Sequence, residues 1–280
     1  MKKIYLLLLS ALAFAPAANA WDGAIKTGIA AIADANLTPT AKKSIDAALG
    51  GHSITYYAYW LDNVSATEGY TQTKSWHYVA FTAKNKLIPA KKTAKSKVEI
   101  VKSAQAYEAL VHAVEVLQNR GNATKEEIAD NIRFVVGILA DLHCPSHYVY
   151  ADLLPQREWK YYYGNKTYNY MRFWEALAFT NAFSNWRANE FVHQLNRKSE
   201  EQIRLLTSGT LTEWIVNNAD EYRRIYMMIT PDQKFDKKSA RLWLNQFYPL
   251  STEYITEAGY RIARVLNGLF DDNVAPVTIK

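Results

Sequence analysis

Apolar residues recur at helical spacing along most of this chain. From Lys95 to about Gln118 they fall three or four positions apart, and the pattern resumes after Thr124 and continues to Leu139. Thr124 is followed three positions later by Glu127, which is the spacing of a capping box at a helix start. The pattern therefore predicts two long helices in the first half of the chain.

The same periodicity predicts further helices over residues 41–49, 173–195, 199–206, 213–229, 238–246 and 252–270. Period-two alternation is almost absent, apart from an aromatic stretch over residues 159–168 in which Gly164-Asn165 could form the turn of a small ribbon. The sequence contains no internal repeat and no long linker. We therefore expect one all-α domain over residues 21–280.

The first twenty residues have the pattern of a secretory signal peptide. Lys2 and Lys3 precede an apolar run, and Ala18-Asn19-Ala20 has the small-x-small form of a cleavage site. Cleavage would make Trp21 the first residue. The alternative is a retained membrane anchor, although the apolar run is short of the roughly 20 residues that a spanning helix needs. We expect an exported protein, either secreted or periplasmic.

Composition limits the kinds of site that the chain can form. Of its 280 residues, 33 are Lys or Arg and 27 are Asp or Glu. Removal of Lys2 and Lys3 leaves 31 basic and 27 acidic residues, a net charge of +4, which permits an anionic ligand without requiring one. Cys144 is the only cysteine, so an intramolecular disulfide and a cysteine-rich zinc finger are both excluded.

Chemically useful side chains gather at the end of the second long helix. The segment Asp141-Leu-His143-Cys144-Pro145-Ser-His147 offers carboxylate and imidazole groups, which suit zinc and similar divalent ions. A polar helix end without metal is the alternative, because histidine is favourable there. A catalytic Cys144–His pair is a further alternative with less support.

Two other polar residues stand among aromatic ones. Asp62 follows several tyrosines and Trp60, and His77 lies between Trp76 and Tyr78. Taken singly, each pattern is also typical of a packed core with a satisfied polar group.

In their order along the chain, these segments resemble the zinc-dependent single-strand nucleases of the S1/P1 type, which are related to bacterial zinc-dependent phospholipase C. The similarity rests on Trp21, Leu37-Thr-Pro, Trp60-Leu-Asp62, Trp76-His77-Tyr78, Asp141-x5-His147 and the run from Glu257 to Asn267. The resemblance implies a mainly helical fold with a cleft that holds three zinc ions. It also implies cleavage of phosphodiester bonds in single-stranded nucleic acid, often with removal of a 3′-phosphate from nucleotides.

The resemblance implies zinc ligands at positions that this chain keeps only in part. They are Trp21 through its freed amine and carbonyl, Asp62, His77, Asp141, His147 and, in the least conserved stretch, Glu175. Three family histidines are replaced by Lys26, Gly137 and Met171, and a carboxylate implicated in catalysis is replaced by Ala80.

The remaining ligands are unevenly shared among the three implied ions. One zinc could keep Asp62, His77 and Asp141, whereas a second would have only His147 and Glu175. We hypothesise that the Lys26 ammonium takes the place of the third ion and pairs with Asp141. The alternative is that Lys26 points into solvent.

Two classes of function therefore remain open. The first is metal-dependent phosphodiester hydrolysis, and the second is a non-catalytic binding protein that uses the same cleft. In both, single-stranded nucleic acid or a nucleotide is the expected partner. The stretch around residues 157–174 interleaves aromatic and basic side chains that could stack bases and contact phosphates, although it could equally be a loop packed on the helical body. The candidate substrate contacts are Lys26, Trp159, Tyr162 and Arg172, and Arg157 belongs to the same stretch.

Overall fold

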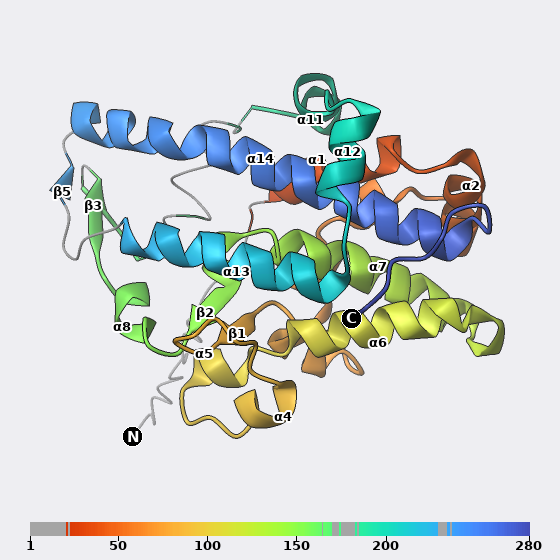
Figure 1. The fold of residues 1–280 in the computed structure, drawn as a ribbon, viewed down its shortest axis with the longest axis horizontal. Helices are drawn as coiled ribbons and strands as arrows, with labels where there is room; N and C mark the ends of the chain where they lie inside the picture. Colours follow the sequence, from red (N-terminus) through yellow and green to blue (C-terminus); the bar gives the residue numbers. More distant parts are fainter. Residues whose placement is uncertain are drawn as a thin grey trace, which may run out of the picture.

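The chain folds mainly into helices, in agreement with the predicted all-α class (Figure 1). The computed structural model describes residues 21, 23–163, 165–169, 174, 183, 185–228, 234–235 and 237–280. Its α-helices are α1 (Gly23–Ala35), α2 (Pro39–Ala48), α3 (Trp60–Val64), α4 (Ala90–Thr93), α5 (Glu99–Lys102), α6 (Ala106–Gln118), α7 (Lys125–Asp141), α8 (Leu154–Arg157), α11 (Ala188–Leu195), α12 (Glu200–Leu206), α13 (Leu211–Met227) and α14 (Lys237–Phe270). Short 3-10 turns are η1 (Ile54–Tyr57), η2 (Thr71–Ser75), η3 (Arg120–Asn122) and η4 (Pro145–His147).

Local capping explains where several predicted helices begin. The Thr124 hydroxyl accepts a hydrogen bond from the Glu127 amide, and the Glu127 carboxylate accepts one from the Thr124 amide, so the capping box is confirmed. The Thr38 hydroxyl caps α2 by accepting a hydrogen bond from the Ala41 amide, with Pro39 at the first position of the helix. α12 begins after Ser199, as the pattern predicts.

Three predicted boundaries are wrong, and in each case tertiary contacts decide the outcome. The helix expected from Lys95 begins only at α6, because the backbone amides of Gln105 and Ala106 donate to Ser75 and Tyr78 instead of to a preceding helical turn. The two helices expected over 238–246 and 252–270 are one continuous helix, α14, with Pro249 inside it. The helix expected over 173–195 is interrupted at residues 185–187, and most of its first half lies outside the described residues.

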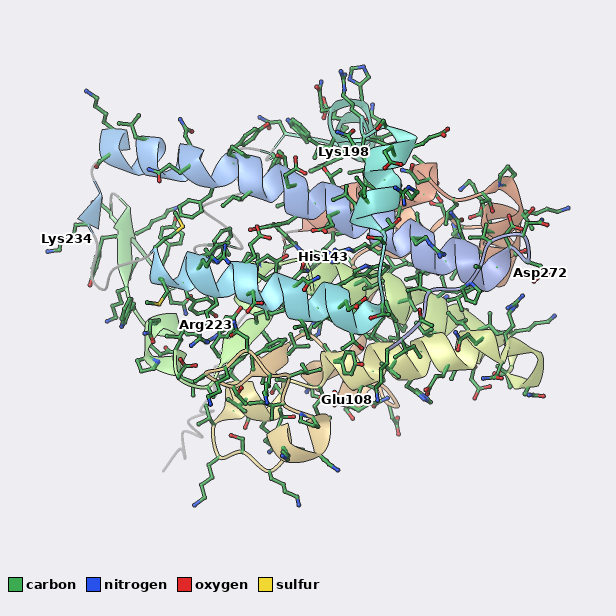
Figure 2. The ribbon with its side chains drawn as sticks, in the orientation of Figure 1. Glu108, His143, Lys198, Arg223, Lys234 and Asp272 are labelled. Atoms are coloured by element: carbon green, nitrogen blue, oxygen red, sulfur yellow. The ribbon has the colours of Figure 1, made fainter. Side chains whose placement is uncertain are left out.

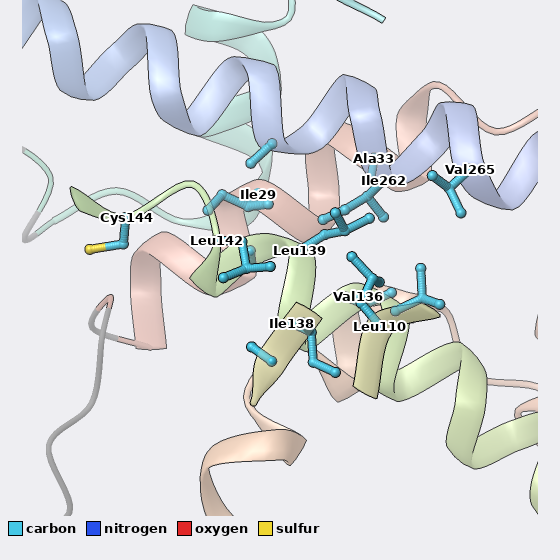
Figure 3. Packing of buried hydrophobic residues seen from close by; sticks show 14 of the residues in the cluster. Ile29, Ala33, Leu110, Val136, Ile138, Leu139, Leu142, Cys144, Ile262 and Val265 are labelled. Carbon is cyan, nitrogen blue, oxygen red and sulfur yellow. The ribbon is translucent and has the colours of Figure 1, made fainter. Parts of the chain in front are cut away.

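Helix α1, which the periodicity did not predict, lies at the centre of the molecule. It packs against α14, α11 and α7. A Cβ added at Gly28 would lie within 2.6 Å of the Phe191 ring on α11, and one at Gly259 would lie within 2.7 Å of Ile32. These glycines therefore let α1 approach both neighbours closely. Side chains of α1, α6, α7 and α14 meet in the core, where Ile29, Leu110, Val136 and Ile262 lie together (Figure 3).

Two small sheets accompany the helices. Strands β1 (Val79–Phe81) and β2 (Tyr148–Tyr150) pair in parallel, with Val79 opposite Tyr148. This register places the segments that carry His77 and His147 side by side. The predicted aromatic ribbon is confirmed as β3 (Tyr161–Tyr163) paired antiparallel with β4 (Lys166–Tyr168), although its turn residue Gly164 lies outside the described residues. β5 (Lys234–Phe235) adds a third strand next to β3.

Within the described part of the chain, no helix combines the length and the apolar character needed to cross a membrane. The long helix α14 is not apolar enough to do so.

Candidate functional site

The candidate site is formed where α1, α3 and the end of α7 meet the β1–β2 pair. Lys26 comes from α1, Asp62 from α3 and Asp141 from the last residue of α7. His77 is separated from the start of β1 only by Tyr78, and His147 is the last residue of the turn η4. Five residues that are far apart in the sequence are thereby brought to one region of the core.

The Lys26 ammonium lies between two carboxylates. Its Nζ is 2.8 Å from Asp141 Oδ1 and 2.6 Å from Asp62 Oδ2. The exposed fractions of the three side chains are 0%, 0% and 3% for Lys26, Asp141 and Asp62. The predicted pairing of Lys26 with Asp141 is confirmed, and the alternative in which Lys26 points into solvent is wrong. The additional pairing with Asp62 was not predicted.

The charges of Lys26 and Asp141 stabilise each other, whereas burial raises the pKa of the Asp62 carboxyl above its ordinary value despite the Lys26 charge. Burial by itself would lower the pKa of the Lys26 ammonium, but the neighbouring charges of Asp141 and Asp62 outweigh burial and raise that pKa above its ordinary value. Burial would likewise raise the pKa of Asp141, but the charge of Lys26, together with His147 and the hydrogen bond from His77, outweighs burial and holds that pKa well below its usual range. Lys26 is therefore cationic and Asp141 anionic across the physiological pH range.

The two histidines complete the surroundings of Asp141. His77 Nδ1 lies 2.8 Å from Asp141 Oδ2, so the carboxylate bridges Lys26 and His77. His147 donates through Nδ1 to the carbonyl of His77, and its ring stacks on Tyr78 with 4.6 Å between ring centroids. Burial lowers the pKa of His147 to about 3, so its ring is neutral near pH 7. Its Nε2 atom is buried without a hydrogen-bond partner among the described residues.

The residues present do not fit the three-zinc cluster that the resemblance implies. A positively charged ammonium occupies the space between the carboxylates, where a metal would need both as ligands. The described residues contain no group of three or more His, Cys, Asp or Glu side chains arranged to hold a metal ion. The single zinc expected on Asp62, His77 and Asp141 therefore finds no suitably arranged group of ligands among the described residues. Among the described residues, the buried and unpartnered Nε2 of His147 suits a metal ligand.

Apolar side chains pack closely around two of the positions where the resemblance implies that a family residue is replaced. A Cβ added at Gly137 would lie 2.8 Å from Cβ of Leu61, so Leu61 fills the space where a longer side chain would begin. Ala80 is 1% exposed and packs with Tyr78, Ala104 and Val149 in a small apolar cluster. A carboxylate at position 80 would enter apolar surroundings instead of a polar site.

The other predicted site residues divide into three groups. Trp21 is fully buried, and its indole donates to the carbonyl of Ala140 at 3.0 Å, next to Asp141. Trp159 is partly buried against the core, and Tyr162 has the Lys234 ammonium 5.8 Å from its ring centroid, so neither lies in the Lys26 cluster. Arg172, Glu175 and Met171 lie outside the described residues.

Two basic residues that the sequence analysis offered as contacts for a substrate, Arg157 and Lys26, are buried. Arg157 was grouped with bases that could contact phosphates, but it is 3% exposed. Its guanidinium donates to the carbonyl of Ser146 at 2.9 Å and to the hydroxyl of Tyr226 at 2.6 Å, and thereby holds the turn that carries His147. Lys26 likewise has no exposed surface with which to contact a substrate.

Two comparisons with known proteins bear on this site. The sequence model of the family described as S1/P1 Nuclease matches residues 26–271, nearly the whole of the described chain. No curated protein sequence matches the chain.

Proposed function

Because this chain belongs to the S1/P1 nuclease family, whose members are zinc-dependent, we propose that it is an exported, non-hydrolytic member of that family. In this proposal it binds single-stranded nucleic acid or nucleotides in the cleft that the family uses. Nuclease-type function holds for the family as a whole. The loss of zinc-cluster chemistry is the specific proposal for this chain.

The observation that carries the proposal is the position of the Lys26 ammonium, 2.6 Å from Asp62 and 2.8 Å from Asp141. A metal cluster hydrolyses phosphodiesters by lowering the pKa of a bound water and by stabilising charge on the phosphate and the leaving oxygen. An ammonium carries half the charge of a zinc ion and coordinates no water as a nucleophile. Lys26 instead holds the two carboxylates together, so they remain in place without a metal.

The surroundings of Lys26 support the same conclusion. Leu61 packs against Gly137, and Ala80 lies among apolar side chains, so two further family positions are closed by packing. Restoring a metal ligand at either position would require neighbouring side chains to move. The site therefore favours a stable, charge-compensated cluster over metal binding.

A metal-dependent hydrolase is the second candidate function, and His147 is the observation in its favour. Its buried Nε2 has no partner among the described residues, as expected of an imidazole that has kept a ligand position. In that case the second ligand would be Glu175. This candidate differs from the first in requiring stoichiometric metal.

The deciding experiment compares the exported protein with a Lys26→Gln variant and a matched Lys42→Gln control. Lys42 also pairs with two carboxylates, but its side chain is 39% exposed. We expect less than one zinc per native chain after zinc loading, no cleavage of a single-stranded oligonucleotide, and measurable binding of that oligonucleotide. Removal of the buried ammonium should destabilise the protein by about 3–5 kcal/mol, whereas the control should change stability by about 0–1 kcal/mol.

Zinc should then stabilise the Lys26→Gln variant but not the native protein, because the freed carboxylates become available as ligands. Thermal unfolding with and without zinc measures this difference. Stoichiometric zinc in the native protein together with zinc-dependent cleavage would overturn the proposal in favour of the hydrolase. If the variant does not fold, the zinc content and cleavage of the native protein still decide between the two candidates.

A further inference from the structure

The positive charge of this chain is concentrated in one surface lobe. We define the lysine lobe as residues 82–105, which contain α4 and α5. Its basic residues are Lys84, Lys86, Lys91, Lys92, Lys95, Lys97 and Lys102, and its single acidic residue is Glu99. The lobe thus holds seven of the 33 basic residues and one of the 27 acidic residues. The rest of the chain carries 26 basic and 26 acidic residues. The formal charge of +6 on the chain equals the charge of this lobe.

The seven lysines are available to a ligand. All of them are exposed, and none forms an ion pair with an acidic residue in the described part of the chain. The carboxylates at the edge of the lobe have other partners. Glu108 accepts from the amide of Ala90 at 2.6 Å, Asp220 accepts from Asn85, and Asp152 pairs with Arg223.

Backbone hydrogen bonds attach both ends of the lobe to the segment that carries His77, residues 75–80. At its start, the Ile88 amide donates to the Ala80 carbonyl at 2.8 Å. At its end, the amides of Gln105 and Ala106 donate to the carbonyls of Ser75 and Tyr78, each at 3.0 Å. Ala104 also packs on Tyr78. The lobe therefore lies beside the candidate site, at the edge formed by α4 and α5 in Figure 1, and side chains ending in nitrogen project from that edge in Figure 2.

We propose that the lysine lobe binds the phosphate backbone of single-stranded nucleic acid that extends beyond the binding site of the proposed function. This inference rests on the proposed function and names the surface that holds the strand outside the cleft. Lysine ammoniums act as point charges for phosphates. The lobe has no aromatic residue, so it contacts the backbone and not the bases. Binding at the lobe is accordingly independent of base sequence and weakens steeply with salt.

The test uses Lys91→Gln/Lys95→Gln in the lobe and the matched control Lys43→Gln/Lys125→Gln. All four lysines are exposed and lack an ion pair among the described residues, and both variants lose the same charge. The probes are an oligothymidylate of about 20 nucleotides, longer than the roughly 4–16 nucleotides of one single-strand site, and thymidine 5′-monophosphate. Fluorescence anisotropy and calorimetry measure binding over a range of salt concentrations.

If each of the two lobe lysines contacts one phosphate, the slope of log affinity against log salt falls by about 1.4, and affinity near 0.1 M salt falls roughly 20-fold. The control variant should keep the native slope. Thymidine 5′-monophosphate should bind both variants equally, because it does not reach the lobe.

Equal oligonucleotide affinities and slopes for the two variants would overturn this inference while leaving the proposed function intact. Failure of the native protein to bind any nucleotide or oligonucleotide would overturn both. A lobe variant that loses only its affinity for phosphatidylglycerol vesicles would overturn the inference in favour of an anionic membrane surface.

Discussion

At the scale of single residues, the interior of this protein contains histidines that fold in the neutral state. His143 lies in the middle of the molecule (Figure 2) and is 1% exposed. Its Nδ1 donates to the carbonyl of Leu139 at 2.7 Å, and its Nε2 accepts from Arg261 at 3.1 Å. Burial, together with the charge of Arg261, lowers the pKa of His143 to about 3. A proton on His143 would remove the acceptor that Arg261 uses.

This arrangement predicts a loss of stability on acidification. The folded pKa lies below the unfolded value of about 6.5, so below that pH the unfolded chain binds a proton that the folded chain does not. The contribution is complete above about pH 6.5 and is lost as pH falls toward 3, at about 1.4 kcal/mol per pH unit. Urea unfolding at several pH values measures how the free energy of unfolding changes with pH. This change per pH unit should be smaller in His143→Gln than in the native protein by about 1.4 kcal/mol.

His193→Gln, at an exposed position on α11, is the matched control for this measurement. Equal pH slopes for the native protein and His143→Gln would contradict the assignment of a neutral buried His143. His147 has the same direction of shift, so part of the native slope should persist in the variant.

At the scale of elements, α3 and α7 are closely packed at Gly137, the position where the resemblance implies a replaced histidine. Gly137 faces Leu61, and a Cβ there would lie 2.8 Å from Leu61 Cβ and 2.9 Å from Leu61 Cδ2. The chain keeps α3 close to α7, and this closeness also places Asp62 within reach of Lys26. Asp62 pairs with Lys26 on α1, so α3 is held close to both α7 and α1.

Gly137→Ala should destabilise the protein, although alanine is the better helix former. Helix propensity favours alanine by about 1 kcal/mol, but overpacking against Leu61 costs about 1–3 kcal/mol. Thermal or urea unfolding measures the balance, which we expect to be a net loss. Gly121→Ala, where an added Cβ meets nothing within 4 Å, is the control and should be close to neutral.

A double-mutant cycle with Leu61→Ala isolates the contact itself. The two changes together should cost less than the sum of their separate effects, because Leu61→Ala removes the contacts with Leu61 Cγ and Cδ2 and leaves only the one with Cβ. An additive result, or a stabilising Gly137→Ala, would show that Leu61 does not restrict this position.

At the scale of the whole molecule, the predicted signal peptide and the site meet at Trp21. Trp21 is fully buried and is hydrogen-bonded to Ala140, which directly precedes Asp141. If cleavage occurs after Ala20, the first residue of the processed chain is one whose side chain is held by the residue before Asp141. Export and assembly of the site are thereby connected in our proposal.

We expect the exported protein to begin at Trp21, as measured by intact mass. Ala20→Asp should block processing because the position before the cut requires a small residue, whereas Asn19→Asp, which alters the unrestricted position of the motif, should be processed normally. A native protein that keeps residues 1–20, or equal processing of the two variants, would refute the signal-peptide assignment.

The sequence by itself determined the features that depend on neighbours a few residues apart. The starts of α2, α7 and α12 follow from their capping residues, and the ribbon follows from its aromatic alternation. Similarity in the order of motifs identified the family, which the match over residues 26–271 confirmed. The resemblance also drew attention to Lys26, although its replacement of a family histidine stays a prediction.

Only the tertiary structure decided the contacts between distant segments. The pairing of Lys26 with Asp62 joins residues 36 positions apart, and the β1–β2 register brings His77 beside His147. Helix α1 could not be recognised by its periodicity because it is buried on several sides, so its apolar residues form no single stripe. Burial and long-range pairing depend on how the whole chain packs, and local sequence patterns contain no record of that packing.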